Sequence, residues 1–208
     1  MVDAEAIINN PSGWFVCMSE AHKRLKQPEW VRTQLLAVAA DLLVQDGPEA
    51  VTLDAVAHRA GVTKGGLQHH FRTKQSLLDA LCDQLFDAFD VFYAAALESE
   101  PEAPGRHARA YLKTCFQGGQ TAEERLTQRA IALLALALPA CRERWSAKMR
   151  VLLAEDRADP AATDRLFLCR LAADGFWFDQ LLDVYGTPPD RKDRLLSLLL
   201  ELTRGTAP

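Results

Sequence analysis

The chain has 208 residues, of which 49% are hydrophobic and 25% charged, and its formal net charge is −4. This length suits one or two domains, and the composition is that of a folded protein with a buried core rather than a disordered one. The longest apolar run, Ala130–Leu138, is too short to span a bilayer. The N-terminus carries Asp3 and Glu5 and lacks the basic and apolar regions of a secretory signal. We therefore expect a cytoplasmic protein without a membrane partner.

The cysteines are odd in number and dispersed, and no two of them form a CxxC pair. They are Cys17, Cys82, Cys115, Cys141 and Cys169. This pattern favours reduced, buried thiols over a disulfide framework or a metal site.

Turn-forming and basic residues precede the first predicted helix. The cluster Asn9–Gly13 favours a turn, and His22–Lys26 forms a basic arm. Since no periodicity accompanies them, we expect residues 1–27 to be a flexible extension. Met18 is a second possible start, so the sequence leaves open whether residues 1–17 belong to the native protein.

The stretch from Glu29 to Phe71 predicts three helices, with the last two arranged as a helix–turn–helix. Apolar residues keep helical spacing over Glu29–Gln45, until Asp46-Gly47-Pro48 stops the helix. A second helix is predicted over Leu53–Ala60, and Gly61 then supplies a residue suited to a helix C-terminus. Thr63 can cap a third helix over Lys64–Phe71. Because the second helix of such a unit enters the DNA major groove, the pattern indicates a DNA-binding regulator.

The remainder of the chain predicts further helices and no strands. Their expected ranges are Lys74–Glu98, Arg106–Gln117, Glu123–Leu138, Ala140–Asp156, about Asp159–Tyr185 and Asp190–Thr203. We expect an all-α protein with a helix–turn–helix DNA-binding domain at residues 28–73. A helical domain for ligand binding and dimerisation is expected at residues 74–208.

Charge is unevenly distributed along the chain. Residues 21–76 hold eight Lys or Arg against five Asp or Glu, together with four of the five histidines. Residues 77–208 hold sixteen Lys or Arg against twenty Asp or Glu. The basic excess therefore coincides with the predicted helix–turn–helix, which supports nucleic-acid binding.

The region Val31–Leu81 resembles the tetracycline-repressor (TetR) family of transcriptional regulators. The residues that carry the resemblance are Thr52, Ala57, Ala60-Gly61-Val62-Thr63, Gly65, Leu67, His70-Phe71 and Lys74. Two positions depart from the family pattern, which usually has Tyr at Gln68 and often Thr or Ser at Gly66. Both lie on the DNA-facing helix, so relatives do not predict the operator sequence.

This interpretation predicts a set of DNA-contacting residues. Lys64 and His69 can reach phosphates or base edges, and Lys74 resembles the family lysine that holds a phosphate. The full predicted set is Thr52, Thr63, Lys64, Gly65, Gln68, His69, His70 and Lys74. Two alternatives stay open: His70 contacts phosphate or packs under the turn, and His22–Lys26 lies along the DNA or is simply solvated.

The resemblance also implies a ligand pocket in the helical body. Such sites are mostly apolar with a few polar groups. The predicted lining is Phe89, Tyr93, Phe116, Trp145, Asp174 and Trp177. For each of these residues, ordinary core packing is the competing interpretation.

A two-fold dimer through the last two helices is likewise implied by the resemblance, because helix–turn–helix proteins recognise palindromic sites as dimers. The predicted interface comprises Leu171, Gly175, Phe178, Leu182, Leu195 and Leu199. Burial of these residues within one chain is the alternative.

No catalytic motif is present: the sequence lacks a Gly-rich phosphate loop, GxSxG, HExxH and a His/Cys cluster at metal-ligand spacing. We therefore expect no enzymatic activity, no cofactor and no metal. The predicted function is a sequence-specific regulator, a repressor rather than an activator, released from DNA by a small apolar or aromatic effector. The alternative is a helical binding or adaptor protein without DNA function.

Overall fold

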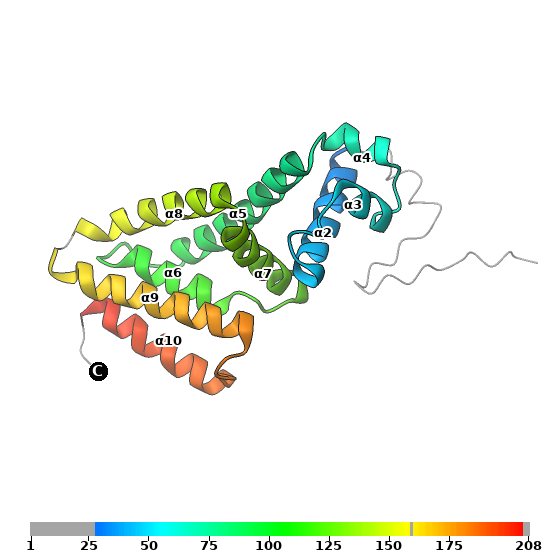
Figure 1. The fold of residues 1–208 in the computed structure, drawn as a ribbon. Helices are drawn as coiled ribbons and strands as arrows, with labels where there is room; N and C mark the ends of the chain where they lie inside the picture. The colour runs from blue at the N-terminus through cyan, green and yellow to red at the C-terminus, as the bar shows by residue number, and fades with distance from the viewer. Residues whose placement is uncertain (1–27, 159, 206–208) are drawn as a thin grey trace, which may run out of the picture.

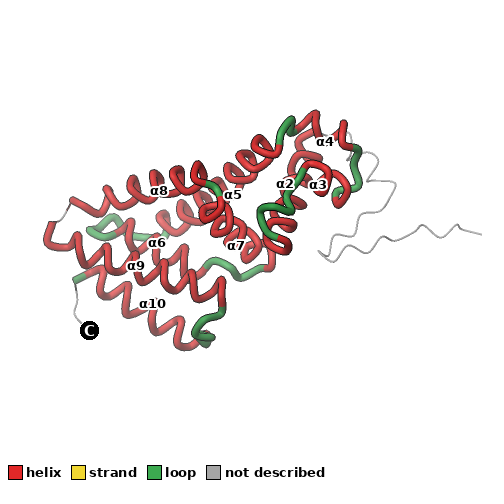
Figure 2. Tube along the Cα trace, viewed as in Figure 1, coloured by secondary structure: helices red, strands yellow, loops and turns green. Residues whose placement is uncertain are grey.

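The computed structural model describes residues 28–158 and 160–205, and within these ranges the chain forms helices joined by loops, with no strand (Figure 2). The elements are α2 (Pro28–Asp46), α3 (Leu53–Arg59), α4 (Lys64–His70), α5 (Lys74–Glu98), α6 (Arg106–Gln117), α7 (Ala122–Ala137), α8 (Pro139–Ala154), the short 3₁₀ helix η1 (Glu155–Ala158), α9 (Pro160–Leu182) and α10 (Pro189–Arg204). The predicted all-α class is confirmed. The predicted extension at residues 1–27, with its basic arm and Cys17, lies outside the described residues. No described helix is long and apolar enough to cross a membrane.

Threonine hydroxyls begin several helices, as expected of N-cap residues. Thr52 accepts a hydrogen bond from the Ala55 amide, and Thr63 accepts one from the Gly66 amide. Thr73 and Ser76 form a reciprocal capping box at the start of α5. The predicted bounds of α5 and α6 agree with the structure, although α6 follows Gly105 and has no side-chain cap.

The predicted helix ending near Tyr185 stops earlier, at Leu182. Asp183 adopts a φ of 51°, in the left-handed region, and the buried carboxylate of Asp179 accepts a hydrogen bond from the Tyr185 amide at 2.7 Å. This hydrogen bond to a side chain replaces a backbone hydrogen bond of the helix, so α9 ends before Tyr185.

Figure 1 shows a small head of α2, α3 and α4 and a larger body. Helix α5 begins in the head and continues far into the body, with α8 running beside it, whereas α9 and α10 lie side by side along one edge of the body. Helix α6 is central, because it contacts α5, α9 and α10.

The buried core continues from the head into the body. One cluster joins apolar residues of α2, α3, α4 and α5 to Ile131 and Leu134 of α7 and to Cys141 of α8. A second cluster lies among α5, α6 and α9 and includes Phe116 and Phe176. The boundary expected between residues 73 and 74 therefore falls at the capping box of α5, within a continuous apolar core.

Two buried ion pairs fix the end of the body that is remote from the head, and sequence patterning did not predict either. Glu100 accepts hydrogen bonds from Arg109 and Lys113, each at 2.6 Å. Asp156 pairs with Arg170 at 2.7 Å. Such pairs are costly to break, because removing one partner leaves a buried charge uncompensated.

The four described cysteines are buried free thiols, as expected. The sulfur atoms of Cys82 on α5 and Cys141 on α8 lie 2.7 Å apart. This proximity was not predicted, because a separation of 59 positions carries no local signal.

Candidate functional site

The turn between α3 and α4 has the geometry expected of a helix–turn–helix. Gly61 adopts a φ of 68°, a value that favours glycine. The Val62 amide then donates to the Ala57 carbonyl at 3.0 Å. These contacts close the C-terminus of α3 and set the direction in which α4 leaves the turn.

Helix α4 is held by one face and exposes the other. Leu67 is fully buried, and Phe71, which follows the helix, is nearly so. The Arg32 guanidinium of α2 lies 5.4 Å from the centre of the Phe71 ring, an additional cation–π contact. Gln68 and His69 are exposed on the opposite face, where contact with another molecule is possible.

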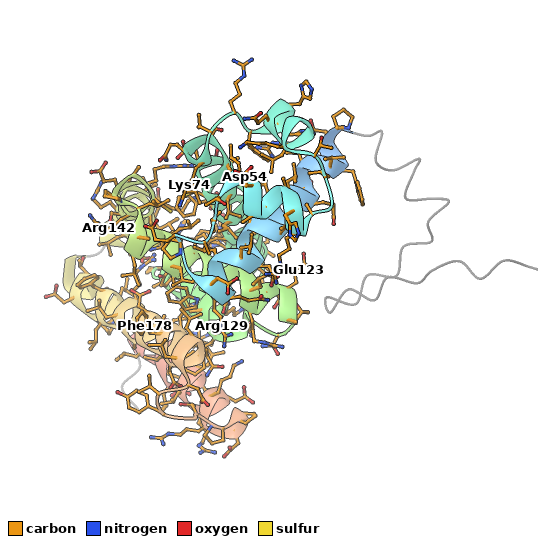
Figure 3. The ribbon with its side chains drawn as sticks, turned by 45° about the vertical axis from the view of Figure 1, so that its right-hand side comes forward. Asp54, Lys74, Glu123, Arg129, Arg142 and Phe178 are labelled. Atoms are coloured by element: carbon orange, nitrogen blue, oxygen red, sulfur yellow. The ribbon has the colours of Figure 1, made fainter. Side chains whose placement is uncertain are left out.

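The two lysines predicted to contact DNA have intramolecular partners in the free protein. The Lys64 ammonium lies 2.9 Å from Asp54, and the Lys74 ammonium donates to the Pro48 carbonyl at 3.0 Å. Figure 3 labels Lys74 and Asp54 on the head. Because exposed ion pairs contribute little to stability, a phosphate can replace Asp54 as the partner of Lys64 at small cost.

The two glycines of α4 differ in their surroundings. A Cβ added at Gly66 would lie 3.2 Å from the capping hydroxyl of Thr63, whereas one added at Gly65 would meet nothing within 4 Å. Packing within the protein therefore explains why residue 66 is small, but it does not explain why residue 65 is a glycine. An open, exposed glycine on the outer face of α4 is suited to close approach by another molecule.

The remaining predicted contacts are mixed. Thr52 and Thr63 are exposed and act as caps. His70 is half-buried, with its ring centre 6.4 Å from that of Phe71. Both interpretations of His70 stay open, since the residue is neither fully buried nor fully exposed.

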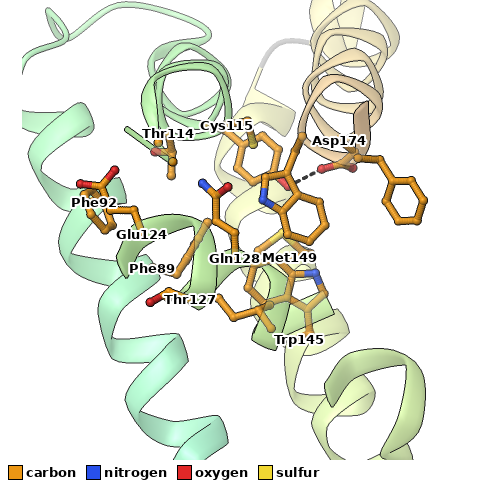
Figure 4. A pocket seen from close by; sticks show the side chains of 16 residues that line it. Phe89, Phe92, Thr114, Cys115, Glu124, Thr127, Gln128, Trp145, Met149 and Asp174 are labelled. Atoms are coloured by element: carbon orange, nitrogen blue, oxygen red, sulfur yellow. Dashed lines mark hydrogen bonds between the residues drawn. The ribbon is translucent and has the colours of Figure 1, made fainter. Parts of the chain in front are cut away.

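The body contains a cavity of about 190 Å³ that is partly open to solvent, many times the volume that one water molecule needs. It lies among α5, α6, α7, α8 and α9 (Figure 4). Its walls include Phe89, Phe92, Tyr111, Ile131, Trp145, Met149, Trp177 and Phe178. Its polar side chains are Thr114, Glu124, Thr127, Gln128 and Asp174.

Asp174 is the best-defined polar group of the cavity. The Tyr111 hydroxyl donates to its carboxylate at 2.5 Å, the contact marked by a dashed line in Figure 4. Burial raises the pKa of Asp174, although the Tyr111 hydrogen bond and Arg170 act in the opposite direction. Burial likewise raises the pKa of Tyr111 well above its ordinary value, so this hydroxyl remains a proton donor.

Four of the six residues predicted for the ligand site line this cavity: Phe89, Trp145, Asp174 and Trp177. The other two lie elsewhere in the core. Tyr93 is buried and exchanges a hydrogen bond with His107 Nδ1 at 2.9 Å, and burial raises its pKa to about 12. Phe116 stacks on Phe176 with ring centres 3.9 Å apart. For these two residues, core packing is the better interpretation.

Sequence reasoning missed much of the lining. Phe92 was not among the predicted lining residues, yet it is 42% exposed and contributes to the cavity. Glu124 and Gln128 come from the first turns of α7, which showed only a polar helix start in the sequence. These two residues reach the cavity only because α7 packs near α5 and α9, and such tertiary packing cannot be seen in the sequence.

The predicted dimer residues fall into two groups. Leu171, Phe178 and Leu182 are exposed on α9, and a Cβ added at Gly175 would meet nothing within 4 Å. Leu195 and Leu199 of α10 are half-buried and pack against the second core cluster. Phe167, Leu168 and Leu198 are also exposed on these two helices, so an unpartnered apolar face is present.

The protein has a helix–turn–helix head, and its core continues along α5 into a helical body that contains a cavity. This arrangement is that of a helix–turn–helix regulator. Residues 35–81 match the model of the family described as "Bacterial regulatory proteins, tetR family". "Tetracyclin repressor-like, C-terminal domain" matches residues 105–204. The chain therefore belongs to the tetR family.

Individual relatives match chiefly over the head. The HTH-type transcriptional repressor KstR2 of Rhodococcus jostii is 38% identical over 72 residues, 33% of this chain and 35% of the relative. The HTH-type transcriptional regulator TtgR of Pseudomonas putida is 35% identical over 77 residues, 37% of this chain and 36% of the relative. The matched region thus spans about a third of these curated relatives.

The whole fold is similar to that of solved proteins. The multidrug binding protein EbrR, in its complex with malachite green, is 28% identical and has a TM-score of 0.60. The similarity covers 82% of this chain and 96% of EbrR.

Proposed function

We propose that this protein is a transcriptional repressor that binds a palindromic DNA operator as a dimer and is released by a small apolar or aromatic effector. Helix α4 would enter the major groove with Gln68 and His69 at base edges. Lys64 and Lys74 would hold phosphates, which position the head without specifying sequence. We place this activity in the cytoplasm and assign residues 28–73 to DNA binding and 74–208 to effector binding and dimerisation.

The observation that best supports the proposal is the path of α5. The helix carries Lys74 at its first residue, beside the helix–turn–helix, and Phe89 in the wall of the cavity. A ligand that changes the packing around Phe89 acts on the same rigid element that positions the head.

Coupling follows if the effector and the DNA favour different arrangements of the two heads in a dimer. The effector then shifts the population toward the arrangement that DNA binds poorly. Its effect is limited by the difference between its affinities for the two arrangements.

The exposed apolar residues of α9 and α10 are the proposed dimer surface. A two-fold axis there would hold two copies of α4 apart in one molecule, as recognition of two half-sites requires.

The experiment that tests the function is selection of bound DNA from a random pool, followed by a gel shift with the enriched site. An enriched palindrome, released on addition of an aromatic ligand, is the expected result. A helical adaptor without DNA function would enrich no sequence and would leave the chain's own upstream DNA unbound.

A further inference from the structure

The cavity combines many aromatic rings with an excess of negative charge. Phe89, Tyr111, Trp145 and Trp177 present ring surface to it. Two carboxylates, Glu124 and Asp174, are its only charged side chains, because no Lys, Arg or His occurs among the described residues that line it. A neutral apolar ligand needs no such charge, and an anionic ligand would be repelled by it.

Two arginines contact residues that line the cavity, and both have partners. Arg170 lies 4.9 Å from the centre of the Tyr111 ring, but it is buried and paired with Asp156 at 2.7 Å. Arg125, which is exposed beside the rim, donates to the carbonyls of Gly119 and Gln120 at 3.0 Å. Neither guanidinium pairs with Glu124 or Asp174 in the free protein.

Each carboxylate is positioned by one hydrogen bond that leaves acceptor capacity. Glu124 accepts from the Gln120 amide at 2.7 Å, and Asp174 accepts from the Tyr111 hydroxyl. A carboxylate has about four acceptor sites. Figure 4 shows the labelled Glu124 and Asp174 on opposite sides of the cavity, with Gln128 between them.

We propose that the cavity selects flat aromatic ligands that carry a positive charge, with Glu124 and Asp174 as the counter-charges that determine specificity. Aromatic faces attract cations through the ring quadrupole, and this attraction is stronger in a desolvated site. A charge delocalised over a ring system suits carboxylates on opposite sides, since it interacts with both through one rigid body. The inference rests on the proposed function, because it assigns a chemical class to the effector proposed there.

The test compares three probes of nearly the same shape and different charge: 1-methylquinolinium, 1-methylnaphthalene and 1-naphthoate. Equilibrium dialysis against the full chain measures the dissociation constant of each. We expect the quinolinium to bind about tenfold more tightly than the neutral probe, and the naphthoate to bind most weakly.

The double variant Glu124→Gln, Asp174→Asn removes both charges and keeps both hydrogen-bond acceptors. It should reduce the preference for the quinolinium about tenfold while leaving affinity for the neutral probe nearly unchanged. The matched control is Glu123→Gln, Asp164→Asn, which makes the same changes on the same helices at exposed residues outside the cavity. Far-ultraviolet circular dichroism confirms that both variants fold.

Equal affinity for the cationic and neutral probes, absence of binding by all three, or an unchanged preference in the double variant would each overturn the inference. Selection of DNA separates this failure from that of the proposed function. An enriched operator without cation preference rejects only the ligand class. Cation preference in a protein that enriches no DNA rejects the regulator and keeps the ligand site.

Discussion

The carboxylate of Glu100 and the guanidinium of Arg109 form an ion pair at 2.6 Å, and each side chain is no more than 3% exposed. Burial raises the pKa of Glu100, but hydrogen bonds from Lys113 and Arg109 outweigh it and hold that pKa below its ordinary value. The pair therefore stabilises the fold above the unfolded-state pKa, and this contribution is lost as the pH falls through the folded-state pKa.

Replacement of Glu100 tests this relationship. Glu100→Gln leaves the Arg109 charge buried without a counter-charge, so we expect the free energy of unfolding at neutral pH to fall by about 3–5 kcal/mol. The loss of stability on acidification should also become shallower. Urea denaturation across the acidic range measures both effects. The exposed control Glu98→Gln should change neither, and equal stability of Glu100→Gln and the parent protein would contradict the prediction.

Gly65 offers a substitution that separates folding from DNA binding. Gly65→Ala meets no atom in the free protein and removes an unfavourable helix residue, so stability should rise by about 1 kcal/mol. DNA affinity should fall, because the added methyl group obstructs close approach of α4. Thermal denaturation and a gel shift measure the two outcomes. Unchanged DNA affinity in the stabilised variant would remove Gly65 from the interface.

Lys74→Ala should weaken binding to all DNA sequences to a similar degree. A lysine that holds a phosphate carries no base information, so removing its charge should decrease the slope of log affinity against log salt by about 1. Gln68→Ala and His69→Ala should instead relax preference at particular base positions. Lys148→Ala is a suitable control, because this lysine is also ion-paired on a helix but lies in the body. If Lys74→Ala showed the same salt slope as the parent protein, the proposed phosphate contact of Lys74 would be excluded.

Leu171→Glu should convert the proposed dimer into monomers that remain helical. A charge placed at the centre of an apolar interface loses hydration without gaining a partner. Leu136→Glu on α7 is the matched control, since Leu136 is even more exposed and lies outside the proposed surface. Sedimentation velocity distinguishes the two. Dimers in both variants would move the interface to another face.

The paired thiols should resist alkylation in the folded protein. Burial raises the pKa of Cys82 and raises that of Cys141 to about 12. Because the thiolate is the reactive species, iodoacetamide should label these residues slowly under native conditions and rapidly in guanidinium. Mass spectrometry of digested samples measures the labelling of each residue, and rapid native labelling of Cys82 would contradict its placement in the core.

The head was predictable because its signals are local. Thr52, Thr63 and Thr73 begin their helices by bonding amides within three residues, and Gly61 adopts the positive φ that its position suggested. A helix–turn–helix is specified largely by caps, turns and one apolar stripe. Sequence patterning detects each of these features.

The cavity was predicted only in part, because it depends on which helices pack together. Aromatic content indicated Phe89 and Trp145 but could not separate them from Tyr93 and Phe116, which fill the core. Glu124 was not predicted as a cavity residue for a different reason. It stands in the polar first turn of α7, where an acidic residue is explained by the helix dipole alone.

Phe178 belongs to two surfaces at once, since it lines the cavity and leaves 46% of its area exposed on α9, where Figure 3 labels it. In the proposed dimer, a second subunit that covers this ring would also close part of the cavity wall. Ligand affinity should then depend on protein concentration, because subunit association and ligand binding become thermodynamically linked. By the same reciprocity, a tightly bound ligand would shift the concentration at which the proposed dimer dissociates, so dilution would act on the regulator as a second input beside the proposed effector.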